Sequence, residues 1–136
     1  MKSYLISHKT RSAFTLVEIM IVVGIIALLA AIALPNFLRA RKRSQATRML
    51  EDLRVIDSAL DQYAIENNKV TGATVNWTDI QLYLKTGSVL YNSGGFDILG
   101  DAYVGFSVDS LPKLRSTSFA KLSDVAPLTF WSPYYP

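Results

Sequence analysis

The chain of 136 residues contains no cysteine and a single histidine, His8. The lack of cysteine excludes a disulfide framework, a thiolate zinc site and a thiol nucleophile, and one histidine excludes a histidine-rich metal site. Charged residues make up only 18% of the chain, below the roughly 25% of soluble domains, and mean hydropathy is +0.22. The length supports one domain, so the apolar excess must lie in a particular segment.

One uninterrupted apolar run from Phe14 to Leu34 holds this excess, and Glu18 is its single charged residue. As a helix the run would extend about 31 Å, close to the roughly 30 Å hydrocarbon core of a bilayer. The rest of the chain is too small to cover a helix that is apolar on all sides. The run therefore predicts a transmembrane helix.

A polar leader, residues 1–13, precedes the run. A secretory signal peptide is cut after its apolar stretch, and Ala31 and Ala33 form an A-x-A pattern there. Cleavage after Ala33 would release a small secreted domain, which stays open as an alternative. The run is, however, longer than the 7–15 residues usual in signal peptides.

The segment from Ala13 to Met20 reads AFTLVEIM, and an unbroken apolar run and Pro35 follow it. This pattern resembles the N-terminus of type IV pilins and type II secretion pseudopilins, over about residues 9–66. The resemblance implies that a prepilin peptidase cuts between Ala13 and Phe14 and that Phe14 is then N-methylated. The family almost always has Gly before the Phe; this chain has Ala13, the nearest residue in size.

Glu18 also stands out on physical grounds. A carboxylate within a bilayer span costs up to about 3 kcal/mol, and such residues are candidates for function. Cleavage would create an amine at Phe14, with a pKa of about 7.7–8.0 in water, which can neutralise Glu18 of a neighbouring subunit. The resemblance implies the same assembly role, which we expect. The alternative is that Glu18 lies at the membrane boundary and reaches the headgroups.

Charge counting and the resemblance disagree about orientation. Basic residues flanking the run comprise three before it and five after it: Lys2, Lys9, Arg11, Arg39, Arg41, Lys42, Arg43 and Arg48. The positive-inside rule would place the second group in the cytoplasm. The resemblance implies a cytoplasmic leader, because the peptidase acts there, and we follow it. We expect a bacterial inner-membrane protein that later enters a periplasmic or extracellular filament.

The basic cluster at residues 39–43 does not predict nucleic-acid binding. It contains no aromatic residue, and residues 49–136 hold six basic and ten acidic side chains, which does not suit a nucleic-acid-binding domain. Without the leader the chain has 11 basic and 11 acidic residues. We interpret the cluster as a solvated helix face among lipid headgroups at the membrane exit.

The helix is expected to continue past Pro35, with a kink there because proline removes a backbone donor and clashes with the preceding turn. From residue 44 to 67 apolar residues recur every three or four positions and form one stripe: Ala46, Met49, Leu50, Leu53, Ile56, Leu60, Tyr63 and Ala64. Asn67 and Asn68 are the expected stop.

The C-terminal half predicts short elements. Thr78 and Gln81 fit a capping box that opens a helix reaching Leu84, with Ile80 and Leu84 facing inward. Strands are expected at 88–91, 102–108 and 116–122. The expected fold is α+β and pilin-like: a long N-terminal helix, half transmembrane and half amphipathic, packed on a small antiparallel sheet. It has four parts: a leader at 1–13, an assembly helix at 14–35, an amphipathic half at 36–67 and a globular region at 68–136.

No catalytic constellation is evident, so we expect no enzyme and no cofactor. The stretch from Asp97 to Tyr103 resembles the D-P-W-G-x-x-Y turn of major pseudopilins, without the Pro and Trp. Those pseudopilins bind calcium in a C-terminal loop. The comparable stretch here, 122–127, holds one carboxylate, Asp124, whereas calcium takes 6–8 oxygen ligands. We therefore predict no metal site.

The C-terminus is rich in aromatic residues: Phe130, Trp131, Tyr134 and Tyr135. We expect this tail to fold back over the small sheet. The alternative is a contact surface for another subunit, a host or a cargo.

The sequence thus predicts a structural subunit of a type IV pilus or type II secretion pseudopilus. The resemblance implies as partners further copies of the chain, a prepilin peptidase, an inner-membrane assembly platform with its cytoplasmic ATPase, and membrane lipid. Two alternatives remain: a membrane-anchored binding module that does not polymerise, and the secreted domain cut after Ala33.

Overall fold

The computed structural model describes residues 14–135 of the chain. The secondary structure of these residues consists of helices: α1 Leu16–Glu66, α2 Trp77–Gln81, α3 Val89–Asn92, α4 Ser116–Leu122 and the 3-10 helix η1 Leu128–Trp131. The chain divides into two compact units, one up to Phe37 and one from Leu38 onward, and α1 contributes residues to both.

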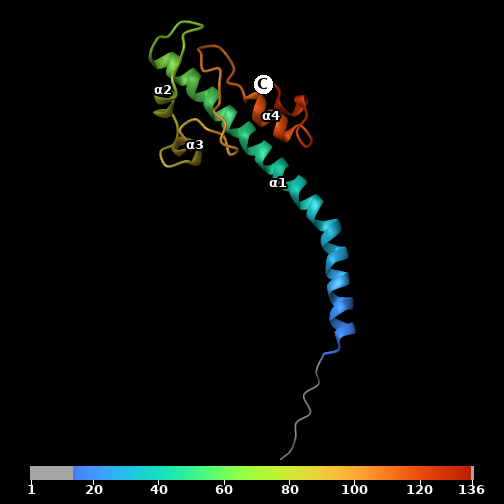
Figure 1. Cartoon of the computed structure of the whole chain (residues 1–136). Coiled ribbons are helices and arrows are strands. Elements are labelled where there is room, and N and C mark those ends of the chain that lie inside the picture. The colour runs from blue at the N-terminus through green and yellow to red at the C-terminus, as the bar shows by residue number, and fades with distance from the viewer. Residues whose placement is uncertain (1–13, 136) are drawn as a thin grey trace, which may run out of the picture. The chain divides into compact units, whose positions relative to one another are not determined.

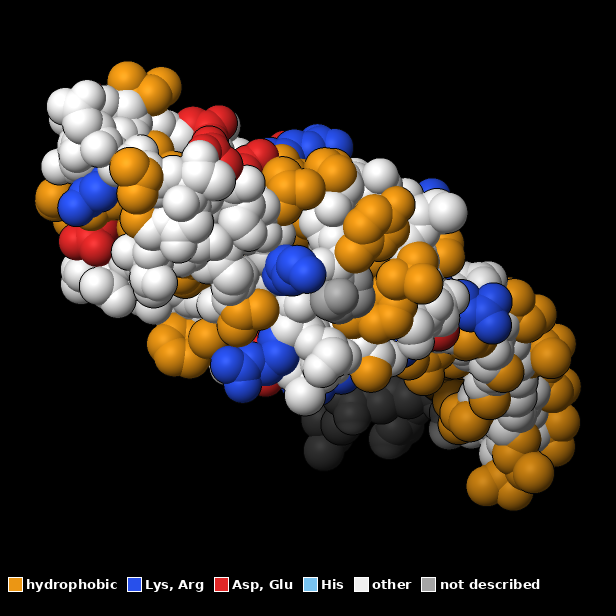
Figure 2. Space-filling view, turned by 90° about the horizontal axis from the view of Figure 1, so that it is seen from above, with side chains coloured by type: hydrophobic (Ala, Val, Ile, Leu, Met, Phe, Trp, Pro, Cys, Tyr) orange, Lys and Arg blue, Asp and Glu red, His pale blue; other side chains and the backbone are white. Residues whose placement is uncertain are grey.

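The first part of α1 is apolar and uncovered. Its side chains from residue 16 to 38 are exposed, and in Figure 2 hydrophobic side chains gather over it. By length and composition this part can cross a membrane. The helix runs through Pro35, which has no N–H to donate to the carbonyl one turn earlier. Next to it, the Asn36 amide donates to the Ile32 carbonyl at 3.3 Å. The kink predicted at Pro35 stays a prediction.

The end of α1 has a defined cap. Asn68 adopts a left-handed conformation with φ 47°. The Lys69 N–H donates to the Ala64 carbonyl at 3.0 Å, and the Asn68 N–H donates to the Ile65 carbonyl at 3.4 Å. These are the two bonds of a Schellman motif, so the stop predicted at Asn67 and Asn68 is confirmed.

The apolar stripe of α1 forms one side of the core of the second unit. Its buried members are Ala46, Met49, Leu50, Leu53, Ile56, Ala59 and Leu60. Tyr63 and Ala64 pack against them while half-buried. The later segments supply the other side through Val75, Ile80, Leu84, Leu90, Tyr103, Val108, Leu114, Leu122, Ala126, Trp131 and Tyr134. Figure 1 shows α2, α3 and α4 arranged around this part of α1.

The small antiparallel sheet expected from the sequence is absent from residues 14–135. Three isolated antiparallel bridges take its place: Thr74 with Ser107, Phe96 with Ala102, and Val104 with Lys113. The segment 102–108 cannot continue as a strand because Gly105 has φ +81°, and the Ser107 N–H is used locally by the Gly105 carbonyl at 3.0 Å. The fold of the described residues is therefore helices and irregular loops, not the α+β fold that we predicted.

Two of the predicted strands are helices. At 88–91 the Ser88 hydroxyl accepts the Tyr91 N–H at 3.1 Å and caps α3. At 116–122 the chain forms α4, in which Ser118 and Leu122 are buried one turn apart. In both segments we took β-prone residues as the signal and overlooked the serine cap and the spacing of four.

The predicted helix after residue 76 exists, but it begins earlier than the capping box that we assigned to Thr78 and Gln81. Asn76 is the N-cap of α2, and its N–H donates to the Asp79 carboxylate at 3.0 Å. The helix ends at Gln81. Ile80 and Leu84 are both buried, which confirms that they face inward.

The aromatic tail folds back onto the core. Trp131 is fully buried and Tyr134 nearly so, and the Trp131 indole N–H donates to the Ala126 carbonyl at 3.1 Å. Phe130 meets the Trp131 ring edge-on at 5.2 Å between centroids. The tail thus supplies core residues, as predicted, although it covers α1 and not a sheet.

A core substitution on α1 tests this arrangement. Leu53→Ala is expected to lower the free energy of unfolding by about 2–5 kcal/mol, because Leu53 is fully buried and its truncation leaves a cavity. Val55→Ala, on the exposed side of the same turn, should change it by less than about 0.5 kcal/mol. Urea unfolding of the full chain in detergent, followed by tryptophan fluorescence, measures both. Equal midpoints for the two variants would contradict the packing described.

Candidate functional site

The first turn of α1 is closed by a reciprocal pair of side chains. One oxygen of Glu18, Oε2, accepts the Thr15 N–H and the Thr15 hydroxyl, both at 2.8 Å. The Thr15 Oγ in turn accepts the Glu18 N–H at 3.2 Å. This is a capping box, in which Thr15 is the N-cap and Glu18 the third helical residue. Its signal, T-x-x-E before an apolar run, is present in the sequence, but we did not predict this capping box.

The capping box leaves a charged group on an apolar surface. Within the described residues the second oxygen of Glu18, Oε1, has no hydrogen-bond donor. Phe14 is 83% exposed, and the neighbouring Ile19, Ile21 and Val22 are exposed as well. A carboxylate oxygen without a donor in an apolar setting favours a cationic partner from outside the chain. Ala13, the other residue of the predicted cleavage site, lies outside the described residues.

Two carboxylates of α1 accept hydrogen bonds from tyrosines that come later in the chain. The Tyr103 hydroxyl donates to Asp52 at 3.1 Å, and the Tyr134 hydroxyl donates to Asp57 at 3.0 Å. Burial raises the pKa of Asp52, an effect that the Tyr103 hydrogen bond partly offsets, and burial likewise raises the pKa of Tyr103. Tyr103 therefore keeps its proton and remains the donor. No spacing rule could have paired residues so far apart in the chain.

The turn after Phe96 is organised by a buried carboxylate. Asp97 Oδ1 accepts the N–H groups of Leu99 at 2.8 Å and Asp101 at 3.0 Å. The Ser118 hydroxyl lies within 2.8 Å of Asp101 and also contacts Asp97, and Lys121 pairs with Asp101 at 3.1 Å. The carboxylates of this turn thus hold the loop to α4 through donors of the chain itself.

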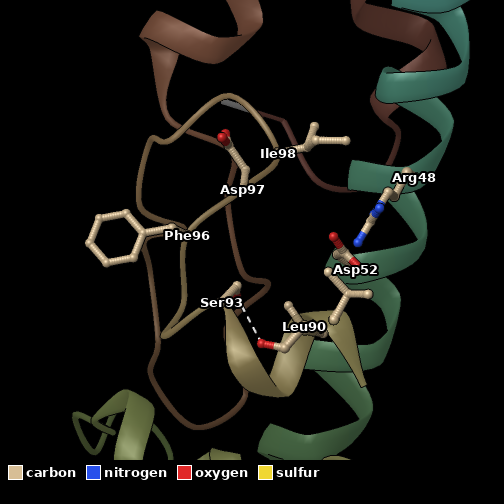
Figure 3. A pocket seen from close by; sticks show the side chains of 8 residues that line it. Arg48, Asp52, Leu90, Ser93, Phe96, Asp97 and Ile98 are labelled. Carbon is tan, nitrogen blue, oxygen red and sulfur yellow. Dashed lines mark hydrogen bonds between the residues drawn. The ribbon is translucent and has the colours of Figure 1, made fainter. Parts of the chain in front are cut away.

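A small cavity of about 120 Å³ lies between α1, α3 and this turn. Figure 3 shows the labelled side chains that line it: Arg48, Asp52, Leu90, Ser93, Phe96, Asp97 and Ile98. The Ser93 hydroxyl donates to the Leu90 carbonyl at 2.8 Å. The cavity brings together no nucleophile and base within hydrogen-bond reach, so it supplies no catalytic set.

Metal ligands do not gather in residues 14–135, where no group of three or more His, Asp or Glu side chains has a suitable arrangement. Asp124, the one carboxylate of the stretch comparable to the pseudopilin calcium loop, forms an ion pair with Lys42 at 2.8 Å. Lys42 lowers the pKa of Asp124. Asp124 thus joins the end of α4 to α1.

The segment that holds Phe14 and Glu18 matches a known family description. Residues 8–34 match the "Prokaryotic N-terminal methylation motif". The match includes the apolar run and the capping box at its start.

Several named proteins are similar to the chain over about half of its length. The type IV major fimbrial protein FimA of Dichelobacter nodosus is 35% identical over 78 residues, which are 57% of this chain and 49% of FimA. The type II secretion system core protein G of Aeromonas hydrophila is 31% identical over 61 residues, 45% of this chain and 43% of that protein.

The type IV wide pilus major component PilA4 of Thermus thermophilus is 41% identical over 63 residues, 46% of this chain and 48% of PilA4. The chain thus spans about half the length of the relatives it matches. No solved structure matches it.

The Asp52 carboxylate gives a pH test of the tyrosine contacts. Its folded pKa lies above the unfolded value of about 3.9, so the folded chain binds this proton more tightly. Tighter proton binding stabilises the fold at pH values below about 3.9, and this stabilisation is lost as the pH rises through the folded pKa. Asp52→Asn keeps an oxygen for Tyr103 but does not titrate. The free energy of unfolding of this variant minus that of the unaltered chain should therefore be larger at pH 7 than at pH 3. Urea unfolding at both pH values measures this difference, and the same difference at both would contradict the prediction.

Proposed function

We propose that this chain, whose N-terminal segment belongs to the type IV pilin and type II secretion pseudopilin family, is a structural subunit of a pilus or pseudopilus filament. By their descriptions, the relatives named above are a type IV major fimbrial protein, a core protein of a type II secretion system and a major component of a type IV wide pilus. The observation that carries the proposal is Glu18: one carboxylate on an exposed apolar helix, with one oxygen free of donors within the described residues.

Assembly then follows from charge pairing at the start of the helix. Prepilin peptidase cleaves between Ala13 and Phe14 and leaves a methylated, positively charged amine at Phe14. That amine of one subunit pairs with Glu18 Oε1 of its neighbour when the apolar helices lie side by side. An unpaired charge among apolar helices is costly, so the pairing selects one axial offset between subunits.

The remaining parts of the proposal concern place and partners. The leader faces the cytoplasm, where the peptidase acts, and the apolar part of α1 holds the subunit in the bacterial inner membrane before assembly. The resemblance to pilins and pseudopilins implies that filament growth depends on an inner-membrane assembly platform and a cytoplasmic ATPase. We assign the chain no enzymatic activity.

The mature N-terminus tests the processing step. We expect mass spectrometry of the protein from host membranes to find a chain that begins at N-methylated Phe14. Ala13→Gly should raise the processed fraction, because it supplies the residue that the family usually has at the cut. A chain that begins at Leu34 would contradict the proposal and favour the secreted domain, and an intact Met1 in every molecule would favour a static membrane anchor.

The charge of Glu18 tests the assembly step. Glu18→Gln keeps the size of the side chain and an oxygen for the Thr15 donors, but it removes the charge. We expect it to reduce assembled filament by about tenfold or more, because an unpaired partner of a buried charge pair costs about 2–5 kcal/mol.

Glu51→Gln is the matched control, since Glu51 is exposed and its ion-pair partner within the described residues is Arg54 of its own helix. Sheared filament is measured by quantitative immunoblot, with membrane-bound subunit as the reference. Normal filament from Glu18→Gln would contradict the pairing of Glu18 with the amine of a neighbouring subunit. Absence of filament from the unaltered chain would favour the membrane-anchored binding module that does not polymerise.

A further inference from the structure

Three arginines directly follow the apolar run of α1: Arg39, Arg41 and Arg43. We call them the arginine collar. All three are exposed, and none forms an ion pair with any residue of the described chain. Long basic side chains without partners are well suited to bind an external anion.

The neighbouring cations differ from the collar in this respect. Lys42, within the same stretch, is half-buried and pairs with Asp124 at 2.8 Å. Arg54, further along α1, pairs with Glu51 at 2.7 Å. The fold thus pairs Lys42 and Arg54 and leaves the three arginines of the collar without an ion pair in the described residues.

The position of the collar indicates which anion it meets. The apolar run of α1 fills one hydrocarbon core, and the headgroup layer beyond it is about 6 Å thick. Four helical steps from Arg39 to Arg43 also rise about 6 Å. Phe37 and Leu38, just before the collar, are exposed and apolar, so the collar lies where apolar surface gives way to headgroups. Guanidinium groups bind phosphate oxygens through paired N–H donors.

We propose that the collar binds the phosphates of anionic phospholipids while the subunit resides in the membrane, and that Asp124 limits the size of this basic surface by neutralising Lys42. This rests on membrane anchoring and not on polymerisation. It gives a role to the basic residues that charge counting alone would place in the cytoplasm: they hold the subunit to the headgroups of the opposite leaflet.

The test uses the full chain in lipid nanodiscs of mixed phosphatidylglycerol and phosphatidylcholine. Native mass spectrometry of the released complexes measures the ratio of the two retained lipids. For the unaltered chain we expect phosphatidylglycerol to be enriched about fivefold over its share of the bilayer, equivalent to about 1 kcal/mol. The triple variant Arg39→Gln, Arg41→Gln, Arg43→Gln should lose the enrichment, and high salt should weaken it.

A matched variant separates the collar from general charge. Arg54→Gln removes a cation that is already paired with Glu51 and lies about 16 Å along α1 from Arg43, beyond the Debye length of about 10 Å, so it should leave the ratio nearly unchanged. Lys42→Gln leaves Asp124 without its partner beside the collar and should lower the ratio. Asp124→Asn releases Lys42 and should raise the enrichment above that of the unaltered chain. Circular dichroism confirms that each variant retains its helix.

The remaining outcomes would overturn the proposal. Full enrichment in the triple variant would place lipid binding elsewhere. Loss of filament in that variant with an unchanged lipid ratio would show instead that the collar contacts acidic side chains of a second copy. Because the nanodiscs hold unassembled subunits, a failure of filament formation does not affect this measurement, and the two proposals can fail separately.

Discussion

Burial of the apolar stripe on α1 is the constraint on which the second unit depends. The segments after residue 67 contain no sheet within the described residues, and their helices have four to seven residues each. Elements this short cannot form a core with one another. They pack instead against Leu53, Ile56 and the other buried residues of α1. Tyr103 and Tyr134 also donate hydrogen bonds to carboxylates of α1. These bonds orient the later segments on the helix, because burial of apolar area alone is not directional.

Elements with a strong periodic signal could be predicted from the sequence. The spacing of three and four identified the stripe from Ala46 to Ala64, and Asn67 with Asn68 marked the end of α1. The apolar run and the AFTLVEIM segment identified the candidate site, because both signals are local. Burial of Trp131 and Tyr134 followed from the need of a small domain for apolar cover.

The loops could not be predicted because their conformation depends on contacts between distant residues. Segment 116–122 has strand-forming residues, yet it is helical, with Ser118 buried against Asp97 and Leu122 in the core. Segment 102–108 alternates like a strand, but Gly105 in a left-handed conformation interrupts it. The Thr15–Glu18 capping box is a different case. Its signal, T-x-x-E, is local and could have been predicted from the sequence, but it overlaps the apolar run that predicts a membrane helix.

Glu18 and the arginine collar matter because the apolar segment of α1 alone does not favour the membrane over a bundle of neighbouring helices. Lipid tails are about as apolar as leucine side chains, so moving this segment from lipid to neighbouring helices changes its hydrophobic free energy little. The balance between stored subunit and filament therefore depends on the groups at its two ends. In the proposed filament, Glu18, with one oxygen lacking a donor in the described chain, gains a partner. In the proposed membrane-bound state, the arginine collar, which has no ion pair within the described chain, binds headgroup phosphates that it gives up on leaving the membrane. The two proposals thus place on one helix a charge that favours departure at its start and charges that favour retention where the apolar run ends.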